Sequence, residues 1–117
     1  MDHWKLSEIK TPLGQRSPVV LHSEEGESRV VLIVLDPGQE LGEHQVKETA
    51  FLLVADGSIR VEAGGETVDA SLGELFRFDP DERHTVSSPG GARLLLYLAP
   101  WPGIGHYRGE ERSVSAS

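Results

Sequence analysis

Short apolar segments alternate with clusters of turn residues along the whole chain. Residues 58–63 show the clearest alternation, because Ile59 and Val61 are apolar whereas Arg60 and Glu62 are charged. This period of two is typical of a half-buried strand. No long segment has helical periodicity, although residues 2–10 are compatible with a short helix or an edge strand. We expect strands at residues 18–23, 28–35, 39–44 leading into 46–55, 58–63, 66–70, 75–78, 84–88 and 92–99.

Glycine and proline separate these segments at short intervals. Asp36-Pro37-Gly38 suits a tight turn, because proline fixes φ at one central position and glycine accepts a positive φ at the next. Asp56-Gly57 is a two-residue hairpin signal, and Gly64-Gly65 predicts the next turn. A chain of about nine short strands must close or stack to hide its edges, which predicts an all-β barrel or a two-sheet sandwich.

In two of the segments, residues 30–35 and 94–98, the residues that would point to either face of a strand are apolar. A sheet with one face in water would alternate, so we expect both faces of these strands to be covered. In a thin barrel the simplest outer cover is a second subunit. We therefore predict a homodimer, formed by sheet packing or by exchanged edge strands.

Composition limits the class of protein and the partners. The 117 residues are expected to form one domain, with a core at about residues 18–108 and a disordered tail at residues 109–117. The formal net charge is −8 and no Lys/Arg cluster interrupts it, so neither a nucleic acid nor an anionic membrane is an expected partner. Cysteine is absent, and the N-terminus lacks the long apolar segment of a signal peptide. We therefore expect a cytoplasmic protein.

Two stretches punctuated by glycine carry the candidate chemistry. In the first, five residues separate Gly38 from His44, and Gly57 closes the stretch. The second opens at Gly73 and ends at His84. Each histidine follows a strand or a turn, and two such units predict that His44 and His84 meet inside a small β-barrel.

The spacing of these glycines and histidines resembles the two motifs of the cupin superfamily. The resemblance covers about residues 30–99, including the hairpin at residues 58–72 that separates the motifs. It implies an all-β, cupin-like jelly-roll β-barrel with a single domain. Many cupins hold Fe, Mn, Ni or Zn with three histidines and a glutamate, so the resemblance also implies a possible divalent metal.

Several positions depart from the family pattern. Val46 stands where the family usually has its second histidine, and Ala50 stands where it has the glutamate. Asp79-Pro80-Asp81 replaces the family's Pro-x-Gly, and Ser88 replaces its asparagine. The metal-binding motifs are therefore incomplete.

Strand alternation places one set of side chains toward the barrel interior. Glu48 shares the parity of His44, so His44, Glu48 and His84 would form a set of two histidines and one carboxylate, as in non-haem iron and catalytic zinc sites. In the competing interpretation, the histidines bond to neutral neighbours and Glu48 is a surface charge. The predicted ligand-binding cavity is lined by His44, Val46, Ala50, Leu52, Phe76, Phe78 and His84.

Three functions would use such a cavity differently. A pair of imidazoles can move protons on an enolisable or sugar-like substrate, because histidine titrates near neutral pH. A metal-dependent oxygenase or isomerase would use His44, Glu48 and His84. A binding module needs only apolar walls and a few polar groups. We favour a small-molecule-binding domain of unknown ligand with a reduced or absent metal site, and the sequence leaves open whether the protein is an enzyme. A purely structural domain would leave the placed histidines unexplained.

A few other residues have simple expected roles. Trp101, which lies between two prolines, is expected to pack over one end of the core. Arg77 is expected to pair with a nearby carboxylate, and His22 is expected to lie on the surface. Tyr97 fits either a cavity or a subunit interface, and His106 is expected in a solvated loop.

Overall fold

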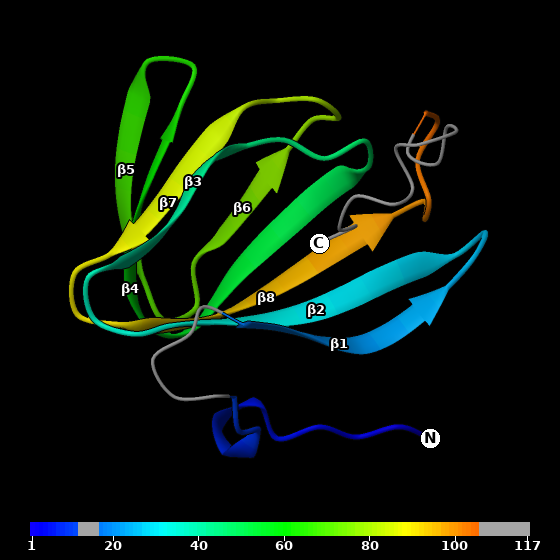
Figure 1. The fold of residues 1–117 in the computed structure, drawn as a ribbon, viewed down its shortest axis with the longest axis horizontal. Coiled ribbons are helices and arrows are strands. Elements are labelled where there is room, and N and C mark those ends of the chain that lie inside the picture. Colours follow the sequence, from blue (N-terminus) through cyan, green and yellow to red (C-terminus); the bar gives the residue numbers. More distant parts are fainter. Residues whose placement is uncertain (12–16, 106–117) are drawn as a thin grey trace.

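The computed structural model describes residues 1–11 and 17–105, with the backbone alone for Ser17, Glu43 and His44. These residues form a short 3-10 helix, η1 (Leu6–Glu8), and eight β-strands (Figure 1). Within this part of the chain, no helix has the length and apolar character needed to cross a bilayer. The strands are β1 (Ser17–Glu24), β2 (Ser28–Leu35), β3 (Gln39–His44), β4 (Thr49–Ala63), β5 (Glu66–Ser71), β6 (Leu75–Phe78), β7 (His84–Ser88) and β8 (Ala92–Ala99).

The strands form two layers that share the long strand β4 (Figure 1). One layer has the order β1-β2-β8-β4-β6, and all of its neighbours are antiparallel. The other layer has the order β3-β7-β4-β5 and is also antiparallel. The curled sheet therefore encloses a core between its two layers, as predicted for a jelly roll.

The predicted hairpin at Asp56-Gly57 is wrong, because β4 runs through both residues without turning. The register of β4 against β8 shifts between Val54 and Asp56, which marks a bulge. Gly57 has φ 78°, and beyond it β4 pairs with β5 and β7 instead of β6 and β8. A bulge of this kind bends a strand so that it can serve two sheets.

The core lies where the inward faces of the two layers meet. Burial alternates along β7 and β8, so that every second residue of each strand is inward. Leu94 and Leu98 of β8 and Val86 of β7 are fully buried in this core. On β7 the buried residues are His84, Val86 and Ser88, which share one side as predicted. On β8, for which both faces were predicted to be covered, Tyr97 is exposed.

The outer face of the first layer is covered in part by the chain's own N-terminal segment. The Arg93 guanidinium, on β8, donates a hydrogen bond to the Leu6 carbonyl oxygen in η1. On β2, Leu32 is fully buried although it has the opposite parity to Val31 and Ile33. Tyr97 of β8 remains exposed on this face, so Tyr97 is not a cavity residue. The homodimer stays a prediction.

Candidate functional site

His84 is the first residue of β7, and its side chain is 4% exposed. Its Nδ1 lies 3.0 Å from the Glu82 carbonyl oxygen. A carbonyl oxygen only accepts, so Nδ1 is the donor in this contact. The ring also stacks on Phe78, with the ring centroids 3.9 Å apart and the planes 2° from parallel. One hydrogen bond and one stacked ring therefore fix the orientation of His84.

The backbone register brings the second histidine to the same place. In the antiparallel pair of β3 and β7, the Cα partner of His84 is His44. On its other side, β7 pairs His84 with Ala63 of β4. The side chain of His44 lies outside the described part of the structure. The meeting of the two rings therefore stays a prediction, supported by this register.

The apolar residues predicted to line the cavity are inward and belong to the core. Val46, Ala50, Leu52 and Phe78 are buried, and Phe76 is half-buried against them. The rings of Phe76 and Phe78 are parallel, with centroids 6.2 Å apart. These residues therefore form an apolar wall that continues from the Phe78 ring, against which His84 stacks.

His84 also lines a cavity of about 290 Å³ at the end of β7. The cavity lies between residues 62–67, which form the β4–β5 hairpin turn, and residues 83–85. Its walls carry the carboxylates of Glu62 and Glu66 and the guanidinium of Arg83. This polar cavity is not predicted from the sequence, because the pairing of Ala63 with His84 joins segments far apart in the chain. The Gly64-Gly65 turn is the available signal, and by itself it indicates turn geometry alone.

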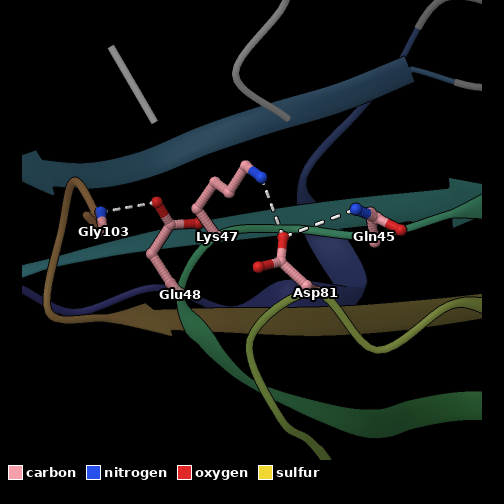
Figure 2. Close-up of polar contacts among 5 residues, drawn as sticks. All are labelled: Gln45, Lys47, Glu48, Asp81 and Gly103. Atoms are coloured by element: carbon pink, nitrogen blue, oxygen red, sulfur yellow. Dashed lines mark hydrogen bonds and ion pairs between the residues drawn. The ribbon is translucent and has the colours of Figure 1, made fainter. Parts of the chain in front are cut away.

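The interpretation that places Glu48 at the protein surface is wrong. Its side chain is 1% exposed, and its Oε2 accepts a hydrogen bond of 2.7 Å from the Gly103 backbone N–H. Figure 2 shows this carboxylate directed at the loop after β8. An ideal Cβ built on Gly103 would lie 2.5 Å from the Lys47 carbonyl oxygen, so the loop and residue 47 are in close contact. Glu48 therefore anchors the loop at residues 100–105.

This loop closes one end of the core, as predicted for Trp101. Trp101 is 3% exposed and belongs to the core cluster. The Arg29 guanidinium carbon lies 4.6 Å from the Trp101 ring centroid, which is a cation–π distance. The Gly26 N–H donates to the Trp101 carbonyl oxygen at 2.6 Å. These contacts join the loop to the β1–β2 hairpin.

The described residues do not fit the complete metal set of many cupins. Val46 and Ala50, at two of the usual ligand positions, are buried aliphatic residues with no donor atom. The Glu48 carboxylate is engaged by the Gly103 N–H. His84 is compatible with a metal, because its Nδ1–H is oriented by a carbonyl as in many metal-ligating histidines. The described side chains at these positions thus supply one imidazole.

Another group of potential metal ligands lies on the β1–β2 hairpin. Among the described residues, His22, Glu24 and Glu27 place ligand atoms within 4.8 Å of one another. His22 Nε2 lies 3.1 Å from a Glu27 carboxylate oxygen. Both glutamates are exposed and His22 is half-buried, so the group is a surface cluster held together by its own pairing.

A second cavity of about 400 Å³ lies against the outer part of β4 and β5. Arg60 and Asp69 line it and pair across the two strands, at 2.8 and 3.2 Å between the guanidinium and the carboxylate. This hydrogen bonding lowers the pKa of Asp69 and raises the pKa of Arg60. Arg60 and Asp69 therefore neutralise each other, and Glu74, the second carboxylate of the lining, accepts from the Ser71 backbone N–H at 2.8 Å.

The remaining predicted residues have clear positions. Arg77 pairs with Asp79 at 2.6 Å, as expected. Ser88, at the family's asparagine position, is fully buried and donates to the Ser58 carbonyl oxygen at 2.6 Å, which links β7 to β4. The predicted tail at residues 109–117 and the predicted role of His106 lie outside the described residues.

Comparison with protein families gives a match to the central part of the chain. A family model described as "Cupin domain" matches residues 31–99 of the 117-residue chain. This span runs from β2 to the end of β8 and includes both histidines. No curated protein matches the chain.

Solved structures share the fold over most of their length. A conserved protein with a double-stranded β-helix domain from Klebsiella pneumoniae is 19% identical, with a TM-score of 0.76, over 88% of this chain and 93% of that one. A cupin superfamily protein from Desulfitobacterium hafniense is 14% identical, with a TM-score of 0.72, over 80% and 84%. A protein of unknown function from Rhizobium leguminosarum is 24% identical, with a TM-score of 0.71, over 86% and 97%. At these identities the likeness concerns the fold.

Proposed function

Because the chain belongs to the cupin family, we propose that it binds a small polar molecule in the cavity beside His84, without a complete metal site. His44, the backbone partner of His84, is proposed as the second imidazole of the site. The family match accounts for the fold, whereas the proposal of ligand binding is argued from the chemistry of these side chains.

The observation that carries this proposal is the fixed orientation of a buried histidine beside a cavity. The Glu82 carbonyl oxygen and the Phe78 ring hold the His84 imidazole in one orientation. The residue that carries this imidazole also lines a polar cavity, together with the hairpin at residues 62–67. The donors and acceptors that line this cavity suit a small polar ligand.

The cavity also limits the class of ligand. Its volume of about 290 Å³ lies just below the range for small-molecule sites, which begins at about 300 Å³, so the ligand must be small. Carboxylates, a guanidinium and the hydroxyl groups of Thr67 and Thr85 line it, so it offers both donors and acceptors. We propose a short polyol, hydroxy acid or amide as the ligand.

The alternative function is a metal-dependent cupin enzyme, an oxygenase or isomerase, that uses His44, Glu48 and His84. The oriented Nδ1–H of His84 favours it, whereas the aliphatic side chains of Val46 and Ala50 at two of the usual ligand positions oppose it. This function requires stoichiometric Fe, Mn, Ni or Zn in the purified protein, as measured by elemental analysis. The metal-free function requires that binding persists after treatment with a chelator.

Titration with a panel of short polyols, hydroxy acids and amides tests the proposed function. We expect the largest backbone amide shifts in ¹H–¹⁵N NMR spectra at residues 62–67 and 83–85, the walls of the cavity. His84→Phe retains an aromatic ring against Phe78 and removes both ring nitrogens. We expect about a tenfold loss of affinity in this variant, because one hydrogen bond contributes about 1 kcal/mol or more.

A matched control is His22→Phe, the same substitution on the surface of the β1–β2 hairpin. It is expected to leave both the shifts and the affinity unchanged. Amide shifts that centre on another part of the molecule, or an affinity that survives His84→Phe, would contradict the proposed site.

A further inference from the structure

The turn before β7 contains an aspartate in a backbone conformation that favours glycine. The Glu82 N–H donates to the Asp79 carbonyl oxygen at 3.0 Å, which closes a four-residue turn. At its third position Asp81 has φ 65°, and among the described residues it is the one non-glycine residue with positive φ. Glycine would adopt this conformation without steric cost. The side chain of Asp81 therefore needs its own explanation.

That side chain ties the turn to the segment that follows β3. Asp81 Oδ1 lies 3.0 Å from Lys47 Nζ and 3.4 Å from Gln45 Nε2, and Figure 2 shows both contacts converging on this oxygen. The Asp81 backbone N–H donates to the Val46 carbonyl oxygen at 2.7 Å. We call this set of contacts the Asp81 clasp. It joins the residues directly after His44 to the turn directly before His84.

Stability does not account for the clasp. About half of the Asp81 side chain is exposed, as is much of Lys47, and an exposed ion pair contributes little to folding. An aspartate with positive φ carries a steric cost of similar or larger size. A glycine at this position would therefore give an equally stable turn.

The clasp leads directly to the orienting partner of His84. Glu82, the next residue after Asp81, supplies the carbonyl oxygen that accepts from His84 Nδ1. A turn held to residues 45–47 keeps this carbonyl in place, and the carbonyl keeps the imidazole in one orientation. We propose that Asp81 is a positioning residue that fixes the imidazole of His84 for ligand binding. This inference rests on the proposed function for the role of the ring, and on the contacts above for its position.

Asp81→Gly tests the proposal, because it allows the same φ and removes only the carboxylate. We expect a melting temperature equal to or above that of the wild type. We also expect the ¹⁵N shifts of the His84 ring to move from those of one fixed tautomer toward averaged values. Affinity for the tightest-binding compound of the polar panel should fall by about tenfold, the lower end of the loss seen when partners that orient metal-ligating histidines are removed.

Two further variants make the test specific. Asp79→Ala removes the same charge from the same turn but leaves the clasp intact, since Asp79 pairs with Arg77. It should leave the His84 ring shifts unchanged. Asp81→Asn keeps an acceptor oxygen and tolerates positive φ, so it should restore most of the wild-type ring signal.

Ring shifts that are unchanged in Asp81→Gly would overturn the proposal, and so would a variant that unfolds, since Asp81 would then act on stability. If no compound of the panel binds the wild type, the proposed function fails. The ring shifts would still decide whether Asp81 positions His84.

Discussion

Replacing Gly57 with alanine should cause the largest loss of stability in this protein. Gly57 has φ 78°, and an ideal Cβ there would lie 2.2 Å from the Gly91 carbonyl oxygen and 2.9 Å from the Ala92 Cα. Both are backbone atoms, so a flexible side chain cannot move aside. Strained backbone and overpacking each cost about 1–3 kcal/mol, so we expect Gly57→Ala to lower the free energy of unfolding by about 3 kcal/mol or more.

Gly38→Ala is the matched control for this prediction. Gly38 has nearly the same φ, 86°, but nothing lies within 4 Å of the position that an ideal Cβ would take there. We expect a loss of about 1 kcal/mol from the backbone conformation alone. Urea denaturation of both variants measures the difference. Equal losses would show that the close approach of β4 to the β7–β8 turn does not constrain the fold.

Replacing Glu48 with alanine should cause the second largest loss. The substitution removes a charge-assisted hydrogen bond of 2.7 Å and leaves the Gly103 N–H without this acceptor. Hydrogen bonds to charged groups contribute about 1.5–3 kcal/mol, and a buried unsatisfied donor costs about 1–3 kcal/mol. We therefore expect Glu48→Ala to lower the free energy of unfolding by about 3 kcal/mol, and the loop at residues 100–105 to separate from the core.

Tryptophan fluorescence reports on this loop. In a Trp4→Phe background, Trp101 is the remaining tryptophan, and its burial predicts a blue-shifted emission. Glu48→Ala should shift this emission to the red below the unfolding transition. Glu48→Gln keeps an oxygen that can accept from the Gly103 N–H, so it should preserve the emission and most of the stability. An unchanged emission in Glu48→Ala would refute the anchoring role.

Most of the strands could be predicted because their signals are local. Alternation and flanking turn residues placed β2, β6, β7 and β8 at the observed bounds. Asp56-Gly57 gives a wrong prediction because a two-residue turn signal describes only its neighbours. What decides the conformation there is the Gly91 carbonyl oxygen, which approaches from the β7–β8 turn. Only the closed fold brings that oxygen to β4.

The site was predicted less completely, for the same physical reason. Parity correctly predicted that Val46, Ala50, Leu52 and Phe78 are inward, because each lies in or beside a regular strand. The contact of Glu48 with Gly103 and that of Asp81 with Lys47 join loops distant in sequence, and no periodicity reports them. The polar cavity beside His84 depends in the same way on strand pairing. The contacts of charged loop residues are thus the part of a site that sequence periodicity predicts least well.

The central claim is that His44 and His84 form one ligand-binding site, and the nuclear Overhauser effect between their ring protons tests it most directly. His44→Gln and His84→Gln variants would assign the ring signals. Because the backbone register makes the two residues cross-strand partners, we predict ring-to-ring cross-peaks and a shift of each ring signal when the other histidine is replaced. The absence of cross-peaks, together with a His44 ring shift that is unchanged in His84→Gln, would contradict the claim.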